Sequence, residues 1–349
     1  MKYRTGKQLY RIVTCALAVV LCAALLMSCG NKAGAKGDDG KLTIVATLFP
    51  EYDWAKQVLG DRAGDKDVEL VMLADDGVDM HNYQPTVEDI DKITKSDVFL
   101  YVGGESDFWI DDVLKNTNDA KMHRVAALDA IGIAALGEET QEGMQEDEHE
   151  HEEAEHQDEE DEEAEHKERG PALDEHVWLS VRNAEVIVAQ IEKAIAAADP
   201  EHAGEYEANA QAYIKELKEL DDRYEETVET APKKAIVVGD RFPLRYLVED
   251  YGLDYYAAFP GCYAEAEASF ETVEFLAKKC DELGLSAILK IDGSKDAIAR
   301  TIRKNTKTKD QKILTIDSMQ SATSKDAAKG KTYLGTMEKD LKVLRRALR

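Results

Sequence analysis

Two histidines stand in loops where a side chain could bind a metal ion. His81 follows a strand-like run, in DDGVDMHNYQPTVEDI, and His176 precedes a helix-like segment, in PALDEHVWLS. Neither belongs to the apolar stripe of a predicted helix. Imidazole nitrogen is a good ligand for borderline metals such as Zn2+, although a lone loop histidine is more often an ordinary surface residue. Both are therefore candidate ligands whose role depends on the fold.

A second stretch rich in possible ligands, EDEHEHEEAEHQDEEDEEAEH, runs from Glu146 to His166. Asp and Glu supply 14 of its 21 residues, which is too much charge for a segment to fold by itself, so we predict a disordered acidic insert within residues 138–170. Carboxylates attract divalent cations, and histidines among them make weak metal sites. We expect an accessory metal-collecting loop, with a plain solvated spacer as the alternative. Its histidines are His149, His151, His156 and His166.

The charge balance limits the classes of partner. The formal net charge is −27, and the stretch from 146 to 166 supplies −14 of it. The rest of the chain is therefore a moderately acidic globular protein. A negative surface of this kind argues against nucleic acid and against an anionic membrane surface as partners.

The N-terminus has the pattern of an exported lipoprotein. Residues 1–11 carry four basic side chains and no acid, and residues 12–28 are apolar and then small. The run ends in LMSC, which resembles a bacterial lipobox and implies cleavage before Cys29 and acylation of its thiol. An ordinary signal peptide is the alternative. We expect a signal peptide at 1–28, a flexible tether at 29–40, and an extracytoplasmic protein anchored to the membrane by lipid.

The rest of the chain predicts an α/β fold with two lobes. Apolar runs such as LTIVATLF, VELVML and DVFLYVGG alternate with amphipathic segments, which is typical of a mostly parallel sheet flanked by helices. We expect an N-terminal lobe at 41–200, one long connecting helix at 201–231, and a C-terminal lobe at 232–349. Ligands of open α/β sheets bind at the carboxyl ends of strands, so the facing lobes should form a cleft.

A family resemblance joins these observations. GVDMHNYQPTVEDIDKITKSDVFLYVGG resembles the first metal-binding motif of the zinc and manganese solute-binding proteins of ABC transporters, the cluster A-I group, and DEHVWLS resembles the second. The resemblance covers nearly the whole mature chain, including the long helix and the acidic insert. It implies that His81 and His176 are metal ligands, that the cleft holds Zn2+ or alternatively Mn2+, and that an ABC permease is the partner.

The chain departs from this family at the remaining ligands. The third family ligand is usually a His or Glu just after the first strand of the C-terminal lobe, where AIVVGDRFPLRYLVEDYGL offers Asp240. This carboxylate could replace an imidazole on zinc or could cap the next helix. At the place of the fourth ligand, commonly an Asp, this chain has Lys331. We choose Glu265 as the substitute, with Glu267, Asp292 and water left open.

Several other residues receive weaker assignments. Cys280 lies at helical spacing in FLAKKCDEL and could be a core residue, so a disulfide with Cys262 stays open. His123 and His202 match no motif and are expected at the surface. Further candidates for shaping the cleft are Tyr263, Ser269 and Trp178.

These features favour a receptor over an enzyme. A metallohydrolase needs an open coordination position and a positioned general base, and the chain contains no HExxH, GxSxG or P-loop motif. We expect a monomeric protein without enzymatic activity that captures a metal ion and hands it to a permease. A cell-surface metal chaperone or adhesin on the same fold is the alternative.

Overall fold

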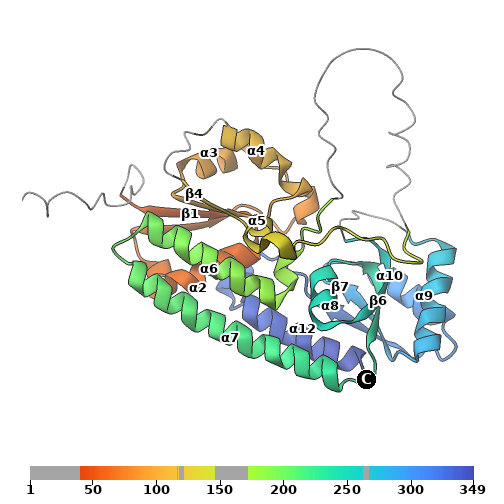
Figure 1. The fold of residues 1–349 in the computed structure, drawn as a ribbon. Helices are drawn as coiled ribbons and strands as arrows, with labels where there is room; N and C mark the ends of the chain where they lie inside the picture. Colours follow the sequence, from red (N-terminus) through yellow and green to blue (C-terminus); the bar gives the residue numbers. More distant parts are fainter. Residues whose placement is uncertain (1–39, 116, 118–121, 146–171, 262–266) are drawn as a thin grey trace, which may run out of the picture. The chain divides into compact units, whose positions relative to one another are not determined.

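The computed structural model describes residues 40–115, 117, 122–145, 172–261 and 267–349. Strands and helices alternate along these ranges, as the sequence predicts (Figure 1). The strands are β1 (Leu42–Ala46), β2 (Val68–Met72), β3 (Val98–Tyr101), β4 (His123–Ala126), β5 (Ala235–Arg241), β6 (Asp254–Phe259), β7 (Ala287–Ile291) and β8 (Lys312–Ile316). The helices are α2 (Phe49–Leu59), α3 (Val87–Lys95), α4 (Phe108–Lys115), α5 (Ala127–Ile131), α6 (Val181–Ala198), α7 (Ala203–Thr230), α8 (Arg245–Tyr251), α9 (Phe270–Leu283), α10 (Ala297–Asn305), α11 (Ser324–Ala328) and α12 (Tyr333–Ala347).

The N-terminal lobe is built on a four-stranded parallel sheet in the order β2-β1-β3-β4. Successive residues of a strand face opposite sides, so Ile44 joins the core beneath α2 and α6, whereas Val45 packs toward α3 and α4. Both faces are therefore covered, which explains why the strands read as continuous apolar runs instead of alternating ones.

The C-terminal lobe repeats this plan with the order β6-β5-β7-β8, again all parallel. On one face Val237 and Ile288 pack against α9 and α10, and on the other Val238 and Leu289 belong to the larger core that includes α8 and α12. The predicted fold class, two α/β lobes with parallel sheets, is confirmed.

The predicted long helix is α7, which spans 28 residues, or about 42 Å at 1.5 Å per residue. It lies alongside α6 and reaches from the N-terminal lobe to α12 near the C-terminus (Figure 1). The buried residues Tyr206, Leu217 and Tyr224 line its inner face. The Tyr224 hydroxyl donates a hydrogen bond of 2.7 Å to the carbonyl of Met337 in α12. One continuous apolar core therefore runs under α7 through both lobes.

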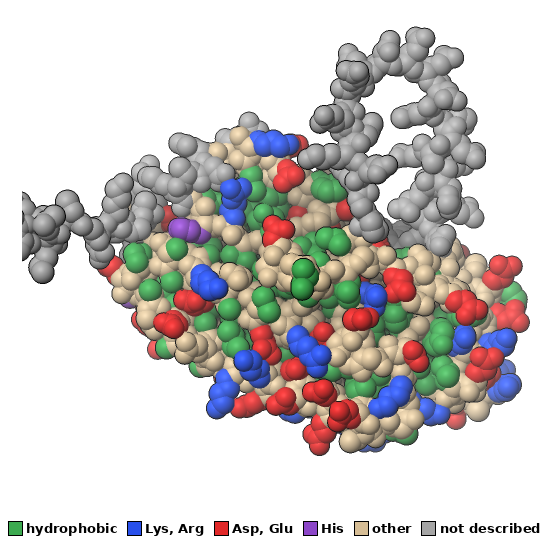
Figure 2. Space-filling model, viewed as in Figure 1, with side chains coloured by type: hydrophobic (Ala, Val, Ile, Leu, Met, Phe, Trp, Pro, Cys, Tyr) green, Lys and Arg blue, Asp and Glu red, His purple; other side chains and the backbone are tan. Residues whose placement is uncertain are grey.

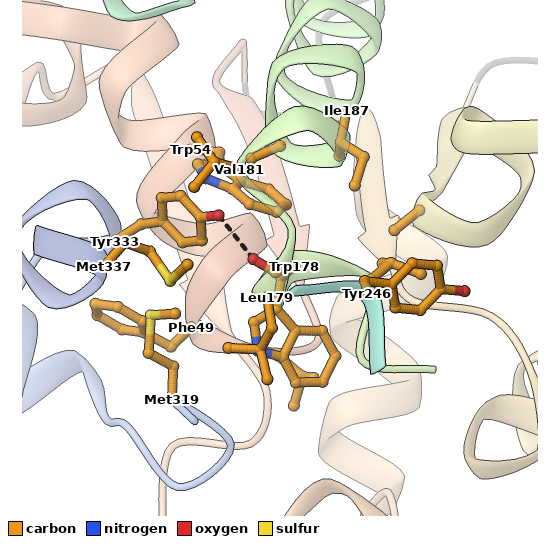
Figure 3. Packing of buried hydrophobic residues seen from close by; sticks show 14 of the residues in the cluster. Phe49, Trp54, Trp178, Leu179, Val181, Ile187, Tyr246, Met319, Tyr333 and Met337 are labelled. Atoms are coloured by element: carbon orange, nitrogen blue, oxygen red, sulfur yellow. Dashed lines mark hydrogen bonds between the residues drawn. The ribbon is translucent and has the colours of Figure 1, made fainter. Parts of the chain in front are cut away.

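Helix α12 is tied to the loop that carries His176. Tyr333, at the start of α12, donates its hydroxyl to the carbonyl of Trp178 over 2.7 Å, the contact dashed in Figure 3. Its ring meets Trp54 edge-on, with centroids 4.9 Å apart. Trp178 in turn donates its indole N–H to the carbonyl of Ser318 over 2.9 Å. Trp178, two residues beyond His176, is therefore held by two separate segments of the C-terminal lobe.

The beginning of the acidic insert differs from the sequence prediction. Residues 138–145, which we assigned to the disordered insert, are hydrogen-bonded to both lobes: the Glu138 N–H donates to the carbonyl of Ala172, and the Gln145 N–H donates to that of Ala258 in β6. Arg245 also pairs with Glu139 at 3.0 Å. The prediction was wrong here because this stem has enough specific partners to fold. The histidines of the insert lie in 146–171, outside the described residues.

The described surface is charged, and its helices show no membrane span. Acidic and basic side chains are interspersed over the face shown in Figure 2, as expected for a solvated surface. None of the helices within the described ranges is long and apolar enough to cross a membrane. The expected signal peptide, tether and Cys29 belong to residues 1–39 and lie outside the described residues.

We predict that the Tyr333→Phe substitution lowers the free energy of unfolding by about 1–3 kcal/mol, because it leaves the buried carbonyl of Trp178 without its donor. Urea denaturation followed by tryptophan fluorescence measures this change. An unchanged unfolding midpoint would show that the hydrogen bond does not hold the loop.

Candidate metal-binding site

His81 and His176 lie 95 residues apart in sequence, and the fold brings their Nε2 atoms to 3.2 Å from each other. His81 sits in the short turn Met80–Asn82 that follows β2, and His176 precedes the turn Val177–Leu179. Their side chains are 6 % and 0 % exposed. The structure therefore joins the two histidines predicted as ligands in one buried cluster.

A serine and a glutamate orient the His81 ring. The Ser106 hydroxyl donates to Glu175 Oε2 over 2.5 Å, and its backbone N–H donates to Oε1 over 2.6 Å. Because this hydroxyl donates its only hydrogen to the carboxylate, it can only accept from His81 Nδ1, which lies 2.9 Å away. The network assigns the hydrogen of the neutral ring to Nδ1, so the Nε2 lone pair is free to bind a cation.

An aspartate gives His176 the same tautomer. Asp174 Oδ1 accepts from His176 Nδ1 at 3.0 Å and from its backbone N–H at 2.9 Å. Asp79 repeats part of this arrangement, because its Oδ1 accepts from the backbone N–H of His81 at 3.2 Å. Both loops thus contain an Asp-x-His unit whose aspartate bonds the backbone of the histidine, but only Asp174 also bonds the ring. Behind the His81 ring the carboxylate is that of Glu175, reached through the Ser106 hydroxyl. A carboxylate behind the imidazole is the arrangement that metal-binding histidines usually have.

Two glycines make room for this network. A Cβ on Gly104 would lie 2.5 Å from Glu175 Oε1, and the φ of +90° at this residue disfavours any other side chain. A Cβ on Gly261 would lie 3.1 Å from His176 Cε1. The backbone at both positions can approach the site closely only because these residues are glycine.

The surroundings keep His81 uncharged near neutral pH. Burial, together with the neighbouring His176 and Arg241, lowers the pKa of His81 to about 4. Burial raises the pKa of Asp79, but the adjacent Arg241 outweighs this effect and the pKa is lowered overall. The neutral His81 imidazole can therefore offer a nitrogen lone pair to a cation near neutral pH.

Gln320 and Arg241, which the sequence did not predict, complete the cluster. Gln320 Nε2 lies 2.8 Å from His176 Nε2 and 3.3 Å from His81 Nε2, so its two amide hydrogens can point at the two free lone pairs. Its Oε1 accepts from Arg241 Nη2 at 3.2 Å. Arg241 also forms an ion pair with Asp79. The repeated Asp-x-His pattern was visible in the sequence, whereas Gln320 and Arg241 belong to no motif.

Asp240, the predicted third ligand, points elsewhere in this arrangement. Its Oδ2 accepts from the backbone N–H of Ile291 at 3.1 Å and from the hydroxyl of Ser294, and its Oδ1 accepts from the backbone N–H of Arg241. The carboxylate thus joins the ends of β5 and β7. The structure does not bring it to the two imidazoles.

The other candidates for the remaining ligands are dispersed. Glu265 lies outside the described residues, and Glu267 is exposed. Asp292 binds the loop after β8, and Lys331 pairs with Asp317 at 2.6 Å. Throughout the described part of the chain, no three His, Cys, Asp or Glu side chains gather in a way that could hold a metal ion. The site seen here is a pair of imidazoles capped by a glutamine.

The structure describes most of the residues with weaker assignments. His123 and His202 are half-buried instead of freely exposed, and His202 Nδ1 lies 2.8 Å from Asp199 Oδ2. Trp178 belongs to the core, and the Ser269 hydroxyl caps the N-terminus of α9. Cys280 lies in α9 and is buried in the core of the C-terminal lobe. Cys262 and Tyr263 lie outside the described residues.

Comparison with known proteins finds zinc-binding and zinc-uptake proteins that are similar to this chain. The zinc-binding lipoprotein AdcA of Streptococcus pneumoniae strain R6 is 31% identical over 329 residues, which cover 94% of this chain and 60% of the relative. This chain therefore spans about three-fifths of the length of that relative. The high-affinity zinc uptake system protein ZnuA of Bacillus subtilis is 30% identical over 335 residues, which cover 95% of this chain and 96% of the relative.

Solved structures agree with the described fold. The Zn(II)-bound ZnuA-like domain of Streptococcus pneumoniae AdcA matches with a TM-score of 0.65 and 28% identity, covering 88% of this chain and 99% of that domain. A Mn-bound periplasmic metal binding protein from candidatus liberibacter asiaticus, with a TM-score of 0.66 and 20% identity, shares the fold. The family model described as "ZnuA: Zinc-uptake complex component A periplasmic" matches residues 44–347. This chain belongs to the ZnuA family.

Proposed function

We propose that this chain is an extracytoplasmic solute-binding protein that captures Zn2+ between its two lobes and delivers it to an ABC permease for import. The observation that carries the proposal is the convergence of the His81 and His176 Nε2 atoms at 3.2 Å, with both Nδ1 atoms bonded to other groups. Two imidazoles suit borderline metals, and divalent zinc binds nitrogen ligands more strongly than manganese does. Mn2+ is therefore the second candidate.

Zinc usually takes four ligands, so two positions remain for other groups. Asp240 and Glu265 stay our predictions for them. Asp240 is adjacent in sequence to Arg241, which touches the Gln320 cap, so a small change at the end of β5 would move it relative to the imidazoles. Binding through Asp240 would require it to leave Ile291 and Ser294.

The acidic insert is proposed to collect metal for this site. Its described stem supports the idea, because Gln145 is bonded to β6 and to the backbone of Ser269, at the start of α9. Its far end returns at Asp174, which holds the His176 ring. Both ends of the insert are therefore anchored on the lobes that carry the site. The proposed collecting residues are His149, His151, His156 and His166.

The proposal extends to the oligomeric state of the protein and its attachment to the membrane. We propose that it acts as a monomer, without enzymatic activity, and that a lipid on Cys29 anchors it to the membrane. The name of the AdcA relative, a zinc-binding lipoprotein, supports the anchoring. Export also agrees with the charged and then apolar N-terminus.

Calorimetric titration with zinc and manganese, with a competing chelator present, tests the proposal on residues 29–349. We predict one tight zinc site that survives deletion of residues 146–168 and disappears in the His81→Ala/His176→Ala double variant. The Asp240→Asn and Glu265→Gln variants identify the other ligands, because loss of a true ligand weakens binding. Tight binding that vanishes with the insert and persists without the two histidines would contradict the proposal.

We also predict that Ser106→Ala weakens zinc binding about tenfold to a hundredfold, since the His81 ring loses the acceptor that fixes its tautomer. The matched control is Ser286→Ala, whose exposed hydroxyl contacts only the carbonyl of Arg349 at 3.4 Å among the described contacts. Competition with a fluorescent zinc chelator measures both affinities. Equal affinity in the two variants would exclude an orienting role for Ser106.

A further inference from the structure

The Gln320 amide occupies the position where a cation shared by the two imidazoles would have to bind. Its nitrogen lies within hydrogen-bonding distance of both Nε2 atoms, and its two hydrogens match the two lone pairs. Gln320 is 2 % exposed. Because each lone pair can serve either the amide or a metal ion, binding of the ion requires the amide to leave.

The chain holds Gln320 in this place from several directions. Met319, directly before it, has a φ of +63°, a conformation that a residue with a long side chain rarely adopts. The Met319 N–H donates to Asp317 Oδ1 at 3.1 Å, and the Ser318 carbonyl accepts from Trp178. Met319 is itself buried among the core residues of Figure 3. Such unfavourable backbone geometry persists only where the surrounding structure enforces it.

Arg241 fixes which end of the amide faces the histidines. Its guanidinium donates to Gln320 Oε1, so the oxygen points away from the imidazoles and the NH2 group points toward them. The same Nη2 atom pairs with Asp79, two residues before His81 in the N-terminal lobe. Arg241 lies at the end of β5, so this ion pair joins the two lobes. A permanent positive charge thus stands beside the imidazole pair and occupies the carboxylate nearest to His81 in sequence.

We propose that Gln320 and Arg241 act together as a built-in competitor of the metal ion. Gln320 caps the two imidazole lone pairs, and Arg241 supplies positive charge and neutralises Asp79, so a divalent cation binds only by displacing both. This inference rests on the proposed function and concerns how that site is tuned. The competitor lowers the affinity of the site and speeds release of the ion, which suits a protein that must pass its cargo on.

The inference is tested by measuring zinc affinity and zinc release in the variants Arg241→Met and Gln320→Ala. Both variants are made in the mature chain, residues 29–349. We expect each to bind zinc about five to thirty times more tightly than the wild type, the factor that corresponds to one or two net hydrogen bonds. Release into excess chelator, followed by stopped flow, should be slower by a similar factor. Arg300→Met, which removes an exposed arginine paired with Asp296, is the matched control and should change neither quantity.

Thermal unfolding without zinc provides a readout that does not depend on affinity: Arg241→Met should unfold at a lower temperature than the wild type, because it loses the ion pair with Asp79. The increase caused by added zinc should be larger in this variant, because the variant binds zinc more tightly. Unchanged or weaker zinc binding in both variants would overturn the inference, and weaker binding in Gln320→Ala would identify Gln320 as a ligand. If the wild type shows no zinc site that depends on His81 and His176, the proposed function itself fails, whatever the variants do.

Discussion

The site depends on a hydrogen bond at the Nδ1 atom of each imidazole, on the side of the ring away from the Nε2 atom. A histidine can present a lone pair to a metal only if its other nitrogen carries the hydrogen and has somewhere to donate it. Here the acceptors are the Ser106 hydroxyl for His81 and Asp174 for His176. These two contacts turn both Nε2 atoms toward one point. Without them, either imidazole could carry its hydrogen on Nε2, and the two lone pairs would no longer face one point.

The rest of the fold maintains this arrangement. His176 is followed by a buried turn whose Trp178 carbonyl is bonded to Tyr333 and whose indole is bonded to the loop of Gln320. Helix α7 packs along the apolar core that both lobes share (Figure 1). A continuous core of this kind resists large hinge rotation, so changes at the site are expected to be small movements of loops or side chains. The observed contacts of Gln320 and Arg241 are side-chain contacts that can change in this way.

Much of this could be predicted from the sequence because it depends on local pattern. The strands of both lobes, the long helix α7 and the two histidine loops follow from apolar runs, amphipathic spacing and recognisable motifs. Gln320 and Arg241 could not be found in the same way. Each lies in a loop or at a strand end with no motif, and each meets His81 or Asp79 from more than 150 residues away in sequence.

The start of the acidic insert differs from its prediction for a physical reason. The insert was placed too early because composition alone does not show that residues 138–145 find partners in both lobes. Contacts between distant segments decide this outcome, and a single sequence does not display them. Asp240 stays a predicted ligand: its carboxylate here joins β5 to β7 through the backbone N–H of Ile291 and the Ser294 hydroxyl, and it would have to leave both to bind zinc.

The most direct test of the two-imidazole site is X-ray absorption at the zinc edge on the zinc-loaded chain lacking residues 146–168. We predict two imidazole nitrogens at about 2.0–2.1 Å from the zinc, with the other ligands being oxygen. The imidazole signal should be lost in the His81→Ala/His176→Ala variant. Zinc bound without imidazole, or an imidazole signal unchanged in that variant, would contradict a site built on His81 and His176.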